Sequence, residues 1–167
     1  QILEGSGAEV HRYFVNGLLA KVADAGGRVT SFTRTDDGFG CLESMTEPNG
    51  AVTTYTRDFA NRPLTVTDGY DNVRTYDYND DGFLVSFTDE EGNTTEYTRD
   101  TGNRITRVDH PDLTFETWTY DANGNVLTHQ ARSGGVTTYS YYEAEEEGGL
   151  TGDLKTVTDP LDGEVTY

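Results

Sequence analysis

Five aromatic residues recur at a constant spacing of 21 positions through the central part of the chain: Tyr55, Tyr76, Tyr97, Trp118 and Tyr139. The residues around them repeat as well, since GAVTTYTRD at 50–58 aligns with GNTTEYTRD at 92–100. A strict short period indicates that one small structural unit is repeated along the chain. Proteins of this kind place their function on an assembled surface rather than in a single pocket.

Each repeat predicts two short strands and two turns. The segment around each aromatic is rich in Thr, Val and Tyr, which favour strands, and a second apolar strand such as 84–88 follows a turn. Gly tolerates positive φ, and Asn and Asp accept hydrogen bonds from the nearby backbone. We therefore assign the repeat turns to six glycines: Gly50, Gly82, Gly92, Gly102, Gly124 and Gly134.

The predicted fold is all-β, with tandem antiparallel hairpins of about 21 residues that form one continuous curved sheet. We count about seven units, or about fourteen strands, when partial copies are included. A single repeat array covers 1–167. Its parts are irregular early repeats (1–47), regular repeats (48–142), an acidic Gly-rich insertion (143–152) and the start of a further repeat (153–167). Both ends fall inside the pattern, so we expect a segment of a longer protein.

The recurring aromatics are predicted to form a structural ladder across the sheet. Successive tyrosines are separated by an intervening strand, and we expect a Leu or Ile of that strand to fill the gap. Two residues further on, the same face carries basic or aromatic residues: Arg57, Tyr78, Arg99, Tyr120 and Tyr141. This pattern favours a packed face with cation–π support over an aromatic strip that binds a ligand.

The charge balance bounds the partners of the chain. Thirty acidic residues face 12 basic ones, for a net charge of −18. This argues against nucleic acid and against anionic membranes as partners. The sequence has no apolar run long enough to span a membrane and no signal peptide. Cys41 is the only cysteine, so an internal disulfide is excluded.

No pattern of reactive residues predicts catalysis. His11, His110 and His129 occupy non-equivalent places and lack metal-ligand spacing, while the paired acids recur with the structural period as turn formers. The acidic turns at 36–38 and 80–82 offer calcium ligands without the spacing of a known calcium loop. We predict no catalytic, cofactor-binding or metal site and no cofactor. The insertion at 143–152 is predicted to be a solvated loop, and it is also the candidate for a special feature, because insertions between repeats often project from one face as binding loops.

Several segments resemble the YD repeat. YDANGNVL at 120–127 has its pattern, YNDDGFL at 78–84 is a close variant, and RDFANRPL at 57–64 resembles an Arg-Asp form with Asn61 where Gly is usual. The family includes rearrangement-hotspot (Rhs) proteins, shell components of insecticidal toxin complexes, bacterial wall-associated toxins and teneurins. The resemblance covers about residues 10–167. It implies a sheet of hairpins that spirals into a hollow β-shell, which in toxin members encloses a C-terminal effector.

Two functions are compatible with this reading. In the first, the chain is a non-catalytic structural segment of a large secreted or surface bacterial protein. It forms the wall of a β-shell that encapsulates a toxin or effector. Its partners are then the rest of the same polypeptide and an encapsulated C-terminal toxin. In the alternative, the repeats form an extracellular adhesin or fibre that binds carbohydrate or a neighbouring cell. Neither requires this segment to insert into a membrane.

Overall fold

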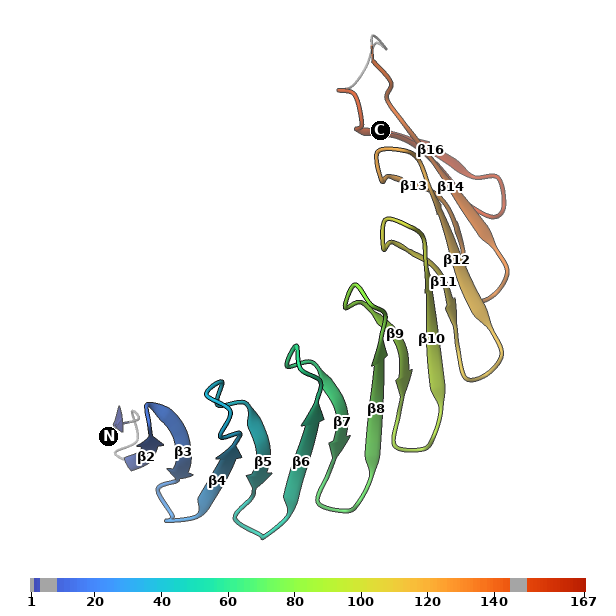
Figure 1. Ribbon diagram of the computed structural model, residues 1–167. Helices are drawn as coiled ribbons and strands as arrows, with labels where there is room; N and C mark the ends of the chain where they lie inside the picture. Colours follow the sequence, from blue (N-terminus) through green and yellow to red (C-terminus); the bar gives the residue numbers. More distant parts are fainter. Residues whose placement is uncertain (1, 4–8, 145–149) are drawn as a thin grey trace. The chain divides into compact units, whose positions relative to one another are not determined.

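The computed structural model describes residues 2–3, 9–144 and 150–167. The contacts divide the chain into two units, residues 1–77 with 88–92 and residues 78–87 with 93–167, and each unit is a series of hairpins (Figure 1). The described residues form sixteen β-strands and no helix, and so no helix able to cross a membrane. About fourteen strands were expected, and two of the sixteen, at the chain ends, have only 2 and 3 residues.

The strands are evenly short and follow one another along the chain. The first eight are β1 (Ile2–Leu3), β2 (Glu9–Val15), β3 (Leu18–Ala23), β4 (Val29–Arg34), β5 (Leu42–Thr46), β6 (Val52–Arg57), β7 (Pro63–Thr67) and β8 (Val73–Tyr78). The last eight are β9 (Leu84–Thr88), β10 (Thr94–Arg99), β11 (Ile105–Asp109), β12 (Phe115–Tyr120), β13 (Val126–Gln130), β14 (Val136–Tyr141), β15 (Leu154–Thr158) and β16 (Glu164–Thr166). The strand order is the chain order, and neighbouring strands within each unit pair antiparallel. The predicted all-β fold of tandem antiparallel hairpins is confirmed.

Most loops share one five-residue geometry, which the turn at 100–104 illustrates. The Asp100 N–H donates to the Arg104 carbonyl at 3.0 Å, and the Asn103 N–H donates back to the Asp100 carbonyl at 3.0 Å. The Asp100 carboxylate also accepts hydrogen bonds from the N–H groups of Gly102 and Arg104, at 2.8 and 3.0 Å. An Asp at the first place therefore satisfies backbone donors that the turn leaves unpaired.

The fourth residue of each such turn has positive φ. Five of the six assigned glycines, Gly50, Gly82, Gly92, Gly124 and Gly134, occupy this place, with φ between 83° and 97°. In the turn at 100–104 the place belongs to Asn103, with φ of 61°, and Gly102 stands one residue earlier. Asn is the residue other than Gly that best tolerates this conformation, which explains the exchange.

A β-bulge recurs in the hairpins where an even-numbered strand pairs with the next strand. Thr56 pairs with Thr65 but Arg57 pairs with Pro63, so Leu64 is the extra residue. The same shift occurs between Thr98 and Arg99, between Thr119 and Tyr120, and between Ser140 and Tyr141. A bulge re-aims the side chains on either side of it and increases the local twist.

The residues that pair with the ladder aromatics differ from the prediction. The cross-strand partners are Val66 for Tyr55, Val108 for Tyr97, His129 for Trp118 and Val157 for Tyr139. The expected Leu or Ile does not fill these places, because the strand register sets Val66 opposite Tyr55 and leaves Leu64 as the extra residue of the bulge.

The sheet is a single layer without a conventional core. Among the described side chains only Ala23 and Val108 are buried. One face carries the ladder aromatics, and we call it the aromatic face. The other is rich in hydroxyls, with cross-strand hydrogen bonds such as Thr56 to Thr65 at 2.6 Å and Thr119 to Thr128 at 2.7 Å. Within each unit, no second layer of described residues covers either face.

Candidate functional site

One pocket lies in the first unit, where the regular repeat is interrupted. The loop between β4 and β5 has seven residues, 35–41, in place of the usual five. It faces the turn at 58–62 across a hollow of about 720 Å³. We call the edge that carries these loops, which follow the even-numbered strands, edge A. The loops of the opposite edge B follow the odd-numbered strands.

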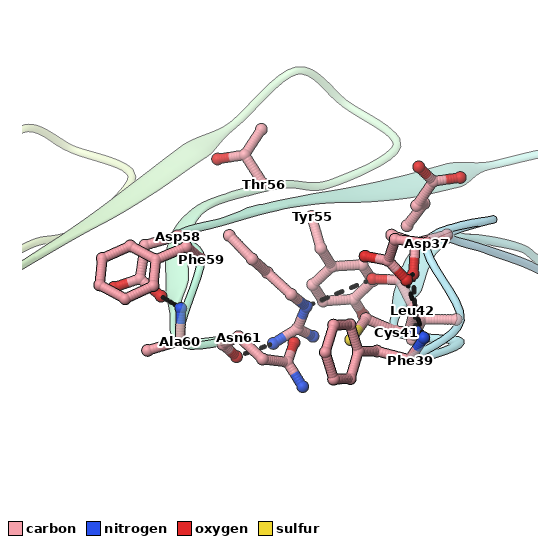
Figure 2. Close-up of a pocket in the computed structure, with 13 residues that line it drawn as sticks. Asp37, Phe39, Cys41, Leu42, Tyr55, Thr56, Asp58, Phe59, Ala60 and Asn61 are labelled. Atoms are coloured by element: carbon pink, nitrogen blue, oxygen red, sulfur yellow. Dashed lines mark hydrogen bonds between the residues drawn. The ribbon is translucent and has the colours of Figure 1, made fainter.

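Two exposed phenylalanines flank this pocket, and local hydrogen bonds hold their loops. The Asp37 carboxylate accepts from the Thr35 hydroxyl at 2.6 Å and from the Phe39 N–H at 2.9 Å. Phe39 is 83% exposed, and Phe59, at the tip of the next turn, is 100% exposed. Figure 2 shows the two rings on opposite sides of the pocket, with Tyr55 beside Phe39. Exposed turn-tip apolar residues recur elsewhere in the chain, as at Leu113 and Leu161, so exposure alone does not distinguish this pocket.

The charge of Arg57 in this pocket is satisfied by the chain itself. Its Nε donates to the Leu42 carbonyl at 3.4 Å and its Nη1 to the Asn61 carbonyl at 3.2 Å. The guanidinium also lies over the Tyr55 ring, 5.7 Å from its centroid. Arg57 therefore joins β5, β6 and the following turn.

This contact recurs with the repeat and gives the recurring Arg and Tyr residues a role that the sequence did not reveal. Each side chain reaches a backbone carbonyl 15 residues earlier in the chain. The contacts are Arg34 to Leu19, Arg57 to Leu42, Arg99 to Leu84, Tyr120 to Ile105 and Tyr141 to Val126. Arg and Tyr share a long reach and a terminal donor, so either can occupy the place. Their cation–π contacts accompany this bond.

The pocket is acidic overall. Asp37, Glu43 and Asp58 line it against the single cation Arg57. The Thr35 hydroxyl and the Phe39 N–H hold the pKa of Asp37 below its usual value. Partial burial raises the pKa of Asp58. Hydrogen bonds from the backbone and side chain of Arg62 lower this pKa by more, so the pKa lies below its usual value. Both carboxylates are therefore ionised at neutral pH.

Equivalent pockets recur along edge A. A smaller one in the first unit, of about 350 Å³, is lined by Leu18, Leu19, Phe32, Arg34 and Asp36. In the second unit, Tyr139 and Tyr141 line a hollow of about 480 Å³ beside the start and end of the insertion. The insertion at 143–152 lies between β14 and β15. Its residues 145–149 are outside the described residues, while the Gly152 N–H donates to the Tyr142 carbonyl at 2.8 Å.

A second cluster, in the second unit, joins two histidines that are far apart in sequence. His110 Nε2 lies 3.1 Å from one oxygen of Glu116, and His129 Nε2 lies 3.0 Å from the other. Hydrogen bonds from His129 and His110 lower the pKa of Glu116. Trp118 stacks on His129, with ring centroids 4.9 Å apart and planes at 8°. The available signal was the polar residue His129 at a ladder place that three other repeats fill with Val.

The remaining residues singled out from the sequence are the ladder aromatics and Cys41. Tyr55, Tyr76, Tyr97, Trp118 and Tyr139 are all half-buried, and each of the four with a described partner faces the next strand on the aromatic face. Cys41 is a free thiol in the first pocket. In the part of the chain that the structure describes, no group of three or more His, Cys, Asp or Glu is placed to hold a metal ion.

Comparisons with known proteins support this reading of the fold. Residues 78–114 match the sequence model of the RHS repeat. No curated protein matches the chain. The crystal structure of TcdB2-TccC3-Cdc42 is similar at a TM-score of 0.66 and 16% identity, over 96% of this chain and 9% of that one. The Photorhabdus luminescens Tc holotoxin pore with a TccC3 mutation is similar at a TM-score of 0.66 and 16% identity, over 94% of this chain and 9% of that one. The crystal structure of TcdB2-TccC3 is similar at a TM-score of 0.64 and 16% identity, over 96% of this chain and 10% of that one.

The repeated turns and the single-layer sheet define a repeat protein built from β-hairpins. The matches specify this class further, because residues 78–114 carry an RHS repeat and the chain has the fold of a β-shell segment. It spans about a tenth of the length of the structures that it matches.

Proposed function

We propose that this chain is a non-catalytic structural segment in the wall of a β-shell that encloses a toxin or effector polypeptide. The observation that carries the proposal is the single-layer sheet. A layer with only two buried side chains among its described residues gains little stability by itself, because hydrophobic burial is the main favourable contribution to folding. Continuation into further hairpins, and closure of the sheet on itself, would remove its open strand edges.

The similar structures support the enclosed-polypeptide part of the proposal. One of them is TcdB2-TccC3 without its hypervariable C-terminal region. It resembles this chain at a TM-score of 0.66 and 16% identity, over 91% of this chain. We propose that the partners of the present chain are the rest of its own polypeptide and such a C-terminal segment. We further propose that the protein acts outside the cell that makes it.

Protease protection tests the proposal on the full-length gene product. A polypeptide inside a closed wall should resist trypsin under conditions that digest an unfolded reference protein. Val108 is 7% exposed and pairs with Tyr97, so Val108→Asp should open the wall and remove the protection. Val136→Asp, at a 41% exposed position, is the matched control and should leave it intact. Digestion of the enclosed segment at the rate of the unfolded reference would contradict the encapsulation.

A further inference from the structure

Three departures from the repeat meet at one place in the second unit. His110 opens a turn of edge B, a place that Asp holds in most of the others. His129 pairs with the ladder aromatic Trp118, where three other repeats have Val. Glu116 precedes Trp118 by two residues, and the equivalent residue in three other repeats is a threonine: Thr53, Thr95 and Thr137. We call His110, Glu116 and His129 the His–Glu–His cluster.

The Glu116 carboxylate joins the two imidazoles. His110 Nε2 lies 3.1 Å from one of its oxygens and His129 Nε2 lies 3.0 Å from the other. An ionised carboxylate only accepts hydrogen bonds, so each Nε2 carries a proton and donates it. The three side chains are 19–27% exposed, so water competes with these bonds only in part. The cluster therefore ties the turn at 110–114 and β13 to β12.

The other charged groups beside the cluster already have partners. Asp109 in β11 is paired with Arg107, and Asp112 in the turn is paired with Arg132. The hydrogen bond from Arg107 and, more weakly, the charge of His110 lower the pKa of Asp109. The cross-strand neighbours of the cluster on β11 and β14 do not titrate: Val108 and Thr137. The charge of the cluster therefore depends mainly on its own three groups.

We propose that the His–Glu–His cluster is a pH-sensitive clasp, which holds the turn at 110–114 and β13 more tightly to β12 when its imidazoles are protonated. Histidine is the side chain whose charge ordinarily changes between about pH 5 and pH 8. Protonation turns each neutral hydrogen bond to Glu116 into a charge-assisted one, which is roughly twice as strong. The Trp118 ring, stacked on His129 at 4.9 Å, adds cation–π attraction to the charged form.

The direction of the pH effect follows from this geometry. A proton that the folded state holds more tightly than the unfolded chain adds stability as the pH falls. The clasp should therefore strengthen between about pH 8 and pH 5.5. Hydrogen bonds from His129 and His110 lower the pKa of Glu116 from its usual 4.5, so the carboxylate keeps its charge throughout this window.

The test compares the midpoint of thermal unfolding of the 167-residue chain with that of Glu116→Gln at pH 8 and pH 5.5. Gln keeps the size of the side chain but carries no charge. We expect the advantage of the parent over Glu116→Gln to be about 2–4 °C larger at pH 5.5 than at pH 8. His11→Gln removes the remaining histidine of the chain, which lies outside the cluster, and is the matched control. Its midpoint should change with pH as that of the parent does.

The fluorescence of Trp118 gives a second measurement on the folded chain, because this is the only tryptophan. An imidazolium stacked on an indole quenches its emission more than a neutral imidazole does. The emission of the parent should therefore fall between pH 8 and pH 5.5. His129→Val, which installs the residue that three other repeats have at this place, should remove that fall.

Two results would overturn the proposal. The first is an advantage of the parent over Glu116→Gln that stays constant or shrinks as the pH is lowered. The second is an emission of Trp118 that does not change with pH, or that changes equally in His129→Val. Neither result depends on whether the full-length protein encloses a toxin, because the protease experiment tests that separately.

Discussion

At the scale of single residues, the fourth position of the five-residue turns shows how the sequence meets a backbone requirement. Gly or Asn fills it in most turns, but Leu113 occupies it in the turn at 110–114, with φ of 66°. Residues other than Gly and Asn adopt this conformation at a cost of about 1–2 kcal/mol. The Leu113 side chain is 94% exposed, so burial does not offset that cost.

Leu113→Asn should therefore stabilise the protein. We expect the free energy of unfolding to rise by about 0.5–1 kcal/mol, since Asn tolerates positive φ and no packing is lost. Urea titration of the two proteins measures the difference. Leu161→Asn is the control, because Leu161 is similarly exposed but the positive φ in its turn belongs to Asp162. A destabilised Leu113→Asn variant would show that the leucine makes a contact that matters.

The ion pair between Arg74 and Glu90 predicts how the stability of the folded protein changes with pH. Two hydrogen bonds, of 2.6 and 2.9 Å, join the side chains, and the Arg74 guanidinium lowers the pKa of Glu90 to about 2. A carboxyl whose pKa is depressed on folding contributes stability above its usual value of 4.5, and that contribution is lost as the pH falls toward 2.

Glu90→Gln should remove this part of the acid dependence. Between pH 5 and pH 2, the midpoint of thermal unfolding should fall less steeply for Glu90→Gln than for the parent protein, at low salt, where the ion pair is least screened. Glu91→Gln, one residue along the same exposed turn, is the matched control. Parallel pH profiles for all three proteins would show that the pair does not contribute to stability.

At the scale of the hairpin, the recurring bulge and the side chain beside it act together. The Tyr120 hydroxyl donates to the Ile105 carbonyl at 2.6 Å, across the strands of two hairpins. The Arg side chains at equivalent places make the same bond to the carbonyl 15 residues earlier. The reach of these side chains links each hairpin to the one before it, in addition to the backbone bonds of the sheet.

Tyr120→Phe tests this link. Loss of the hydroxyl leaves the Ile105 carbonyl without that donor, and we expect a cost of about 1–2 kcal/mol in the free energy of unfolding. Tyr139→Phe is the matched control, because the Tyr139 hydroxyl has no hydrogen bond to another described residue. Equal effects of the two substitutions would contradict the proposed link between hairpins.

The hairpins and their order could be predicted from the sequence, while the contacts between hairpins could not. Tyr55 to Tyr139 mark the repeat because local strand and turn preferences generate the period. The place of Leu64 as the extra residue of a bulge depends on the register of two strands, which no single segment encodes. His110 and His129 meet at Glu116 only once β12 and β13 pair. The pocket beside Phe39 depends on two loops from different hairpins.

At the scale of the whole molecule, each unit is a sheet of hairpins whose described residues are almost all half-buried or exposed. The stability of such a protein comes mainly from contacts between neighbouring repeats. The aromatic face and the exposed rings of edge A are then surfaces that neighbouring parts of the same protein, or an enclosed polypeptide, can cover. Wall formation is the function that these properties favour.

Cryo-electron microscopy of the full-length gene product tests the account most directly. We predict a closed hollow shell in which residues 1–167 form part of the wall, with hairpins continuing the sheet on both sides and density for a polypeptide inside. An open or elongated assembly, with these hairpins exposed to solvent on both faces and no interior, would contradict the account and favour an adhesin or fibre.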